Sequence, residues 1–442
     1  MGQKLSMSES ARFVMPVIAE NAFTVSVSLI YSAVTGAISA GSLAAATVGN
    51  QAMNMISALF AALSTGSAIL TARLTGKQDE DAASRTVEQT LLLTPVLSVL
   101  ATAIMLASSS FIIRLLMPGA EGEFLQEGSL YFRVILLSVP FTIMMNASAG
   151  MLRAAGQSRV VLVGTVISNA VQLAAVYLLA SVGGMGLKGV ALATVICRAA
   201  GCAYLTCMLL INHRGFRVSK ARIFHPDKQV IRRIFSVGLP ASVDSIAVQL
   251  GYVVINSLLV NMGRTYASVV SVLNSVLVFT GITQGIGAAV STTLVGHKIG
   301  AGDIPGARRT LNSILLSCEL SSFVLCIPAI LFSGWSAGLF SKDADVILAA
   351  SSFMWIQIPY CFSAVGVNVC EPAVRVGGDV KYAMINITVC VLLIRLPLTY
   401  LFCIRNSFGV AGIYTANITS LTARFAVDYL RIRSEKWGKR EL

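Results

Sequence analysis

Two carboxylates lie inside apolar stretches of this 442-residue sequence, and their chemistry most needs an explanation. Glu20 and Asp244 each stand four residues after a proline, Pro16 and Pro240. Each proline removes a backbone donor and is predicted to bend its helix, which frees a carbonyl near the acid. Insertion of an acid at the centre of a membrane helix costs roughly 3 kcal/mol. We therefore predict a cation or proton site at each acid; the alternative is a carboxyl hydrogen-bonded for packing.

The residues after Glu20 are polar at helical spacing. Thr24, Ser28, Tyr31 and Thr35 follow at intervals of 4, 4, 3 and 4 and fall on one face of a helix. Lipid does not accommodate such a stripe, so this face is predicted to meet a wet cavity or another helix.

Further polar side chains are predicted to line the same kind of cavity. Asn50 and Asn274 each begin a stripe of small and polar residues, and Tyr252 and Gln284 extend the predicted polar lining. Small residues also allow helices to approach closely, so helix packing remains the alternative for these stripes.

A third acid, Glu371, precedes a proline and stands four residues before Arg375. This spacing favours an ion pair within one helix. A coupling role and a structural pair are both open for Glu371. Glu319 also falls in an apolar stretch, and packing is the favoured interpretation there.

The elements that must position these residues are membrane-spanning helices. Hydrophobic residues make up 55% of the chain and charged residues only 12%, against about 25% charged in soluble domains. The mean hydropathy is +0.78. A spanning helix needs about 20 apolar residues. The apolar runs predict twelve spans, near 12–38, 43–72, 86–112, 129–152, 159–182, 187–211, 232–260, 265–296, 310–333, 347–374, 381–403 and 409–430.

The distribution of basic residues predicts the orientation. With both termini inside, 25 of the 33 Lys and Arg fall in cytoplasmic segments, Arg424 among those of the tail, and 6 fall outside. This bias indicates a multi-pass protein of the bacterial inner membrane with both termini cytoplasmic. Arg198 and Arg395 remain within spans. The net charge of +13 is thus explained by loops, and no nucleic-acid partner is expected.

The two halves of the sequence repeat each other. A shift of 224 residues places Pro16 on Pro240 and Glu20 on Asp244 without a gap, and later Arg153 pairs with Arg375. Six spans per half make the repeat parallel, which predicts an all-α protein of two parallel six-helix bundles with a cavity between them. The predicted units are 1–212, a cytoplasmic linker at 213–233, and 234–442.

Motifs for enzymatic chemistry are missing from the sequence. It contains no Walker motif, no Ser-His-Asp grouping and no pair of histidines at metal-binding spacing. The nine cysteines form no C-x-x-C pair and are predicted to be reduced. We therefore expect no catalytic residue, no metal site and no cofactor other than a transported ion.

Several segments together resemble the multidrug and toxic compound extrusion (MATE) transporters over about residues 12–430. They are 15–21 (MPVIAEN), 42–49 (SLAAATVG), 153–157 (RAAGQ), 238–241 (GLPA), 295–303 (VGHKIGAGD) and 395–398 (RLPL).

The resemblance implies the MOP flippase-like fold and a monomeric exporter of small, often amphipathic cationic compounds, driven by inward H⁺ or Na⁺ through alternating access. It places coupling acids at Glu20, Asp244 and Glu371, and polar residues of a cation site at Asn169 and Thr194. Leu173 stands where many members carry an aspartate.

Two alternatives to coupled export follow from other classes of membrane protein. A flippase for a lipid-linked precursor would need a basic cavity, and only Arg198 and Arg395 are basic within the spans. A membrane enzyme or receptor would need a catalytic constellation or a soluble domain, and neither is visible.

Overall fold

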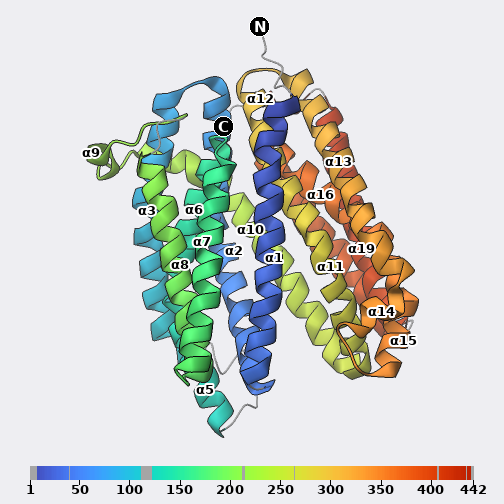
Figure 1. Cartoon of the computed structure of the whole chain (residues 1–442). Helices are drawn as coiled ribbons and strands as arrows, with labels where there is room; N and C mark the ends of the chain where they lie inside the picture. Colours follow the sequence, from blue (N-terminus) through green and yellow to red (C-terminus); the bar gives the residue numbers. More distant parts are fainter. Residues whose placement is uncertain are drawn as a thin grey trace. The chain divides into compact units, whose positions relative to one another are not determined.

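Long helices make up nearly all of this computed structural model, which describes residues 7–38, 40–110, 122–211, 215–262, 264–405, 408–434 and 436–439 (Figure 1). The first half contains α1 (Met7–Ile38), α2 (Ala40–Lys77), α3 (Glu80–Ala107), α5 (Gly122–Leu136), α6 (Val139–Ala154), α7 (Ser158–Val176), η1 (Tyr177–Val182) and α8 (Gly186–Ile211). A short helix, α9 (Lys220–Ile223), lies in the linker.

The second half follows the same order of long helices. It contains α10 (Lys228–Met262), α11 (Arg264–Val290), η2 (Ser291–Val295), α12 (Gly296–Gly300), α13 (Ile304–Leu331), α14 (Ser333–Gly338), α15 (Ala344–Phe353), η3 (Met354–Ile356), α16 (Gln357–Val376), α17 (Val380–Val389), η4 (Cys390–Arg395), α18 (Leu396–Tyr400), η5 (Leu401–Arg405) and α19 (Gly409–Arg433).

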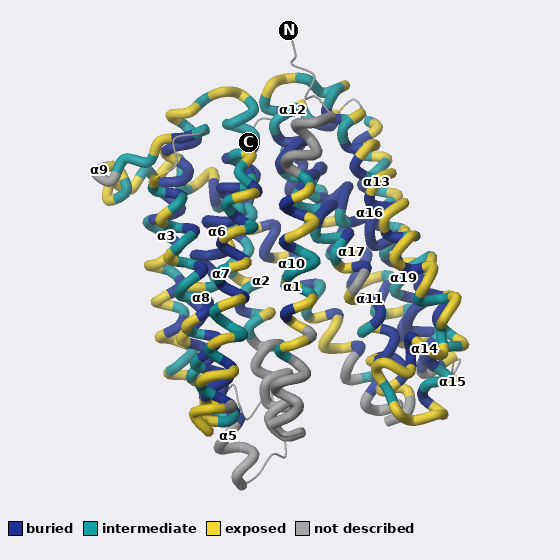
Figure 2. Tube along the Cα trace, in the orientation of Figure 1, coloured by how far each residue is buried: buried dark blue, intermediate teal, exposed yellow. Residues whose placement is uncertain are grey.

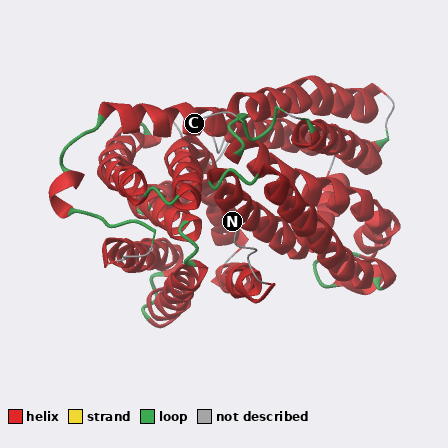
Figure 3. Cartoon of the chain, turned by 90° about the horizontal axis from the view of Figure 1, so that it is seen from above, coloured by secondary structure: helices red, strands yellow, loops and turns green. Residues whose placement is uncertain are grey.

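The all-helical membrane fold predicted from the sequence is confirmed. The described ranges contain no strand (Figure 3). Within them, eight helices are long and apolar enough to cross a membrane, and counting two bent helix pairs as single spans raises the number to ten. One of these pairs, formed by α5 and α6, bends by 45°. Helical segments also occupy the first and last predicted spans, as α1 and α19.

Large apolar side chains lie on the outward faces of the helices. On α13, Leu316, Leu320 and Val324 are 62%, 58% and 68% exposed, and on α3, Val96 and Ile104 are 59% and 58% exposed. Exposed positions recur along both helices in Figure 2. A spacing of four residues keeps the α13 side chains on one face of the helix. Contiguous apolar faces of this kind are typical of surfaces that meet lipid.

By its internal contacts the chain divides into two compact units, residues 3–242 and 243–442, and the boundary falls inside α10. Residues before the boundary pack on α2 because Gly238 has no side chain: an added Cβ would overlap the Ala62 carbonyl. The Ser242 hydroxyl also donates to the Leu59 carbonyl at 2.9 Å and accepts from the Ala62 amide at 2.8 Å. The division into 1–212, 213–233 and 234–442 stays a prediction.

The sequence repeat is visible in the backbone. Gln78 and Gly302, 224 residues apart, have φ of 62° and 78°, in the left-handed region. The next residues, Asp79 and Asp303, cap α3 and α13 by accepting backbone N–H groups at 3.0 and 2.8 Å. Both halves therefore make the same turn and start the same helix by the same cap.

The described part of the linker is bound to α3. Glu88, which is 1% exposed, accepts the Ser219 backbone N–H at 2.7 Å and lies 3.4 Å from the Arg222 guanidinium. Beside it, Gln89 accepts the Asp227 backbone N–H at 3.1 Å. These side chains satisfy backbone groups of an irregular segment, so the linker is ordered against the N-terminal unit.

Candidate functional site

The N-terminal unit holds a buried carboxylate–arginine pair. Glu20 on α1 is 7% exposed and forms an ion pair with Arg153 near the end of α6. Thr165 on α7 donates a hydrogen bond to the Glu20 carboxylate at 3.2 Å. Three helices that are distant in sequence therefore converge on one acid, and its charge is compensated.

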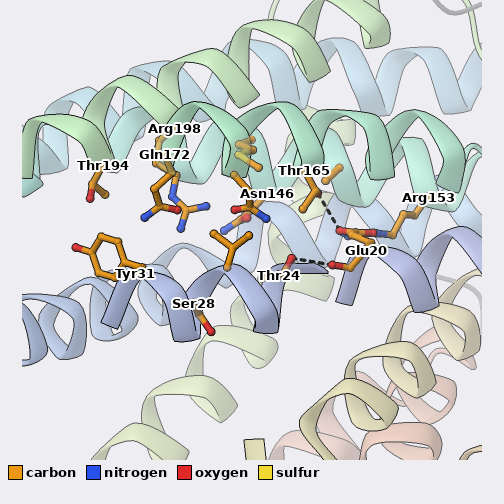
Figure 4. A pocket seen from close by; sticks show the side chains of 14 residues that line it. Glu20, Thr24, Ser28, Tyr31, Asn146, Arg153, Thr165, Gln172, Thr194 and Arg198 are labelled. Carbon is orange, nitrogen blue, oxygen red and sulfur yellow. Dashed lines mark hydrogen bonds and ion pairs between the residues drawn. The ribbon is translucent and has the colours of Figure 1, made fainter. Parts of the chain in front are cut away.

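A cavity of about 390 Å³ extends from this pair through the N-terminal unit (Figure 4). Glu20, Arg153 and Thr165 lie at one end of it, and Tyr31 and Thr194 lie at the other. The full lining consists of Glu20, Thr24, Val27, Ser28, Tyr31, Met145, Asn146, Ala149, Arg153, Thr165, Asn169, Gln172, Thr194 and Arg198.

This lining brings together four of the residues predicted from the sequence, namely Glu20, Tyr31, Asn169 and Thr194. The polar stripe that begins at Glu20 does face a cavity as far as Tyr31, while the side chain of Thr35 lies outside the described residues. The cavity also contains five polar residues that the sequence did not predict for it: Asn146, Arg153, Thr165, Gln172 and Arg198.

The C-terminal unit holds a larger charge cluster. Arg375 on α16 donates to Asp244 of α10 at 2.7 Å and also pairs with Glu371, four residues earlier on the same helix. Glu371 forms a second ion pair with Arg424 of α19. The intrahelical pair expected from the spacing of Glu371 and Arg375 is present, and Arg375 in addition bridges two acids.

Asp428 adds a third carboxylate to this cluster. It is fully buried and accepts a hydrogen bond from the Asn386 amide at 2.8 Å, and the same amide donates to the backbone carbonyl of Arg424 at 3.1 Å. One oxygen of Asp428 and one of Asp244 have no hydrogen-bond partner among the described residues. The cluster thus combines three carboxylates with two guanidinium groups.

Sequence analysis missed part of this cluster and misplaced Arg424. It counted Arg424 with the cytoplasmic tail, whereas the residue is 8% exposed and paired inside α19. The available signal was the four-residue spacing of Arg424 and Asp428, which puts both charges on one face of the last span. Burial of that face could be recognised only once its partners Glu371 and Asn386 were in place.

A second cavity, of about 270 Å³, lies within the C-terminal unit. It brings together the predicted residues Tyr252, Asn274 and Gln284, with Arg395 and Tyr414 beside them. The Tyr414 hydroxyl donates to the Asn274 side-chain carbonyl at 3.0 Å. The remaining lining residues are Ile255, Leu259, Val270, Leu277, Val278, Gly281, Tyr360, Ile413 and Asn417.

Other predicted residues lie away from the two cavities or outside the described residues. Pro16 and Pro240 are inside the continuous helices α1 and α10. The Glu319 carboxyl is buried on α13 and has no hydrogen-bond partner in the described part of the chain. The side chain of Asn50 lies outside the described residues. The proposed roles of all these residues stay predictions.

The two acid–arginine pairs are related by the internal repeat. Glu20 and Asp244 are repeat mates, and so are Arg153 and Arg375, their ion-pair partners. The same charged contact therefore links α1 to the end of α6 in one unit and α10 to the end of α16 in the other. Among the described residues, no group of three or more His, Cys, Asp or Glu side chains could hold a metal ion.

Apolar helices, two related halves and polar cavities inside each unit are typical of a membrane transporter. The sequence model of the MatE family matches residues 16–178 and again residues 240–401. The chain belongs to this family, and the resemblance noted in the sequence is confirmed.

The chain is also similar to curated proteins and to a solved structure. It is 24% identical to an uncharacterized transporter, YisQ, of Bacillus subtilis, over 90% of this chain and 87% of the relative. It is 24% identical to the probable multidrug resistance protein NorM of Thermotoga maritima, over 98% and 93% of the two chains. A solved outward-facing multidrug resistance MATE family transporter of the MOP superfamily superposes with a TM-score of 0.88, at 19% identity, over 96% and 94%.

Proposed function

We propose that this protein is a secondary active exporter of small organic compounds that works by alternating access and is coupled to inward flow of H⁺ or Na⁺ through its C-terminal unit. The observation that carries the assignment of the coupling site is the buried cluster around Asp244, Glu371 and Asp428. With all groups ionised, its three carboxylates exceed its two guanidinium groups, Arg375 and Arg424, by one charge.

A buried excess charge is costly unless a counter-ion neutralises it. A proton taken up by one of these acids supplies that neutralisation, and its departure restores the excess charge. A sodium ion would do the same if fewer than three of the described acids bound it, because no larger group of them could hold a metal ion. The free oxygens of Asp244 and Asp428 offer the acceptor positions for the incoming ion. Arg375 contacts both Asp244 and Glu371, so neutralising one acid changes how strongly the arginine holds the other.

The N-terminal unit supplies no comparable excess of negative charge among its described residues. Its one acid at the cavity, Glu20, is balanced by Arg153, and Arg198 adds a positive charge. The family resemblance implies an aspartate four residues after Asn169, and this chain has Leu173 there. We therefore assign coupling to the C-terminal cluster and a structural or gating role to the Glu20–Arg153 pair.

The name of one relative supports the substrate class, since the similar protein of Thermotoga maritima is a probable multidrug resistance protein. We extend this class, small organic compounds, to the present chain as part of the proposal. We also propose that the protein is located in the bacterial inner membrane, that both its termini are cytoplasmic, and that it is a monomer. The resemblance implied cationic substrates. The carboxylates of Glu20 and Asp244, which could attract a cation, are each already paired with an arginine.

Transport in proteoliposomes tests the coupling site. Pure protein is reconstituted, and Na⁺ and pH gradients are imposed separately, with cationic ethidium and anionic naphthalene-2-sulfonate as the transported probes. We expect one gradient to drive transport of at least one probe. Asp244→Asn and Asp428→Asn should each abolish this gradient dependence, because the neutral cluster has no charge for the ion to balance.

The matched control is Asp345→Asn, which removes an exposed acid at the start of α15 and should leave transport unchanged. Full gradient-driven transport in both cluster variants would refute the coupling site. Translocation of a lipid-linked phosphate, with no gradient-driven transport of either probe, would instead favour the flippase alternative.

A further inference from the structure

Arg395 lines the cavity of the C-terminal unit and is nearly buried. It ends the π-helical turn η4, where one extra residue per turn widens the helix, and its side chain reaches the cavity lined by Tyr252 and Asn274. The residue is 6% exposed. Its guanidinium carbon lies 4.8 Å above the ring of Tyr252, and its Nε has no hydrogen-bond partner among the described residues.

No described carboxylate pairs with Arg395. Of the acids within the helices of this unit, Asp244 and Glu371 pair with Arg375 and Arg424, and Asp428 is bound by Asn386. Glu319 is buried on α13 without a hydrogen-bond partner among the described residues, and Asp343 and Asp345 are exposed at the start of α15. None of these three acids forms an ion pair with Arg395. The remaining pairs of this unit, Asp379 with Arg431 and Asp303 with Lys298, use other bases. The acids 435 and 441, which the structure does not describe, belong to the C-terminal tail beyond α19.

An uncompensated guanidinium in a low-dielectric site is unfavourable, and the Tyr252 ring offsets only part of that cost. A mobile anion in the cavity would supply the missing charge. Arginine is well suited to this role because its planar fork binds carboxylate, sulfonate or phosphate oxygens through two parallel hydrogen bonds.

The other lining residues match an anion that carries an apolar or aromatic body. Tyr252, Tyr360 and Asn417 line the same cavity as Arg395 and carry hydroxyl and amide donors. Apolar side chains such as Ile255 and Leu277 form the rest of the wall and could cover the body of the ligand.

The side chains that line the cavity of the N-terminal unit also carry a net positive charge. Its lining contains Glu20, which is balanced by Arg153, and a further base, Arg198. No ion pair joins Arg198 to a described carboxylate. Arg198 and Arg395, the two bases that the sequence analysis left within spans, therefore each line a cavity, one in each unit.

We infer that the cavity of the C-terminal unit is a binding site for the anionic group of an amphipathic organic compound, held by Arg395 and packed against the tyrosines beside it. The inference rests on the proposed export function and reverses the substrate charge that the family resemblance implies. The anionic group could belong to a small soluble compound or to a lipid headgroup, and the two sources share this chemistry.

Equilibrium binding to the full-length protein in nanodiscs of zwitterionic lipid tests the site. The two probes are naphthalene-2-sulfonate and 2-naphthyltrimethylammonium, which share an aromatic body and carry opposite charges. Calorimetric titration should detect saturable binding of the sulfonate and at least ~10-fold weaker binding of the ammonium compound, equivalent to about 1.4 kcal/mol.

Arg395→Gln should weaken sulfonate binding at least ~10-fold, and Arg395→Lys should retain part of it because the charge remains. The matched control is Arg405→Gln, which removes an exposed arginine at the end of η5 and should bind the sulfonate normally. Tyr252→Phe gives a second variant that keeps the ring under Arg395 and should fold even if Arg395→Gln does not. Loss of the Tyr252 hydroxyl should lower the affinity for the sulfonate only modestly.

Equal binding of both probes, or unchanged sulfonate affinity in folded Arg395→Gln, would overturn the inference. Repeating the titration in nanodiscs with anionic lipid identifies the source: competition by the lipid points to a headgroup, and unchanged affinity points to a soluble anion. Binding at equilibrium does not require transport. Failure of the export proposal would therefore leave sulfonate binding intact, whereas efflux of ethidium without sulfonate binding would sink this inference alone.

Discussion

At the scale of single residues, the acids inside the spans differ in how their charges are balanced. Glu20 has one guanidinium partner and a hydroxyl donor, whereas the acids around Asp244 share two guanidinium groups among three carboxylates. A buried pair is weak evidence for stability, but removing one member leaves an unpaired charge and is strongly destabilising. This difference separates a structural pair from a site that can take up an ion.

A double-mutant cycle on Glu20 and Arg153 measures this effect. Arg153→Gln should lower the free energy of unfolding by about 2 kcal/mol, less than for a fully buried pair, because the Arg153 side chain is 26% exposed. Glu20→Gln should lower the free energy of unfolding by less, because the amide oxygen can still accept a hydrogen bond from the Thr165 hydroxyl. The double variant should recover about 1–2 kcal/mol relative to the sum of the single changes. Unfolding in detergent micelles provides the measurement, and strictly additive costs would contradict the pairing.

At the scale of elements, close helix contacts depend on small residues. The start of α10 packs against α2 at Gly238 and Gly66, where a Cβ on either glycine would meet the backbone of the other helix. Small residues at such crossings are typical of membrane helices, which pack through van der Waals contact and not through the hydrophobic effect. The same crossing carries the Ser242 hydrogen bonds to α2.

Gly238→Ala tests this contact. Because the new methyl group would overlap the Ala62 carbonyl, we expect a loss of about 1–3 kcal/mol in the free energy of unfolding. Gly281→Ala is the control, since it also alters a glycine inside a long helix but meets open space. It should be neutral or stabilising by roughly 0.5–1 kcal/mol. Equal thermal stability of the two variants would show that the α2–α10 contact is looser than described.

At the scale of the whole molecule, two repeated halves each build their own charged pair and their own cavity. The repeat also sets the same left-handed turn before α3 and α13. The six spans predicted for each half would place the basic segments of both halves on the same side of the membrane, and the positive-inside rule predicts that this side is the cytoplasm.

Reporter fusions test this orientation. A green fluorescent protein placed after residue 442 should fluoresce in bacterial cells, because it folds in the cytoplasm. A periplasmic phosphatase at the same position should be inactive. A phosphatase inserted at residue 343, between α14 and α15, should be active, because this segment is predicted to be external. The reverse pattern of activities would invert the assigned topology.

The sequence by itself determined that this protein lies in a membrane, that it is helical, that its two halves repeat and which family it belongs to. These properties follow from local apolar runs, from matched positions such as Glu20 and Asp244, and from motifs read in order. The Glu371–Arg375 pair was also predictable, because four residues along a helix bring two side chains together.

Only the tertiary structure decided which charges are balanced. Arg153 reaches Glu20 across 133 positions and Arg424 reaches Glu371 across 53, and no local pattern specifies contacts at such separations. The same holds for Arg395, which is one more base in an apolar helix by sequence alone. In the C-terminal unit it lies among tyrosines and has no carboxylate partner in the described part of the chain. In a low-dielectric interior, charge balance depends on neighbours within a few ångströms, and packing alone selects those neighbours.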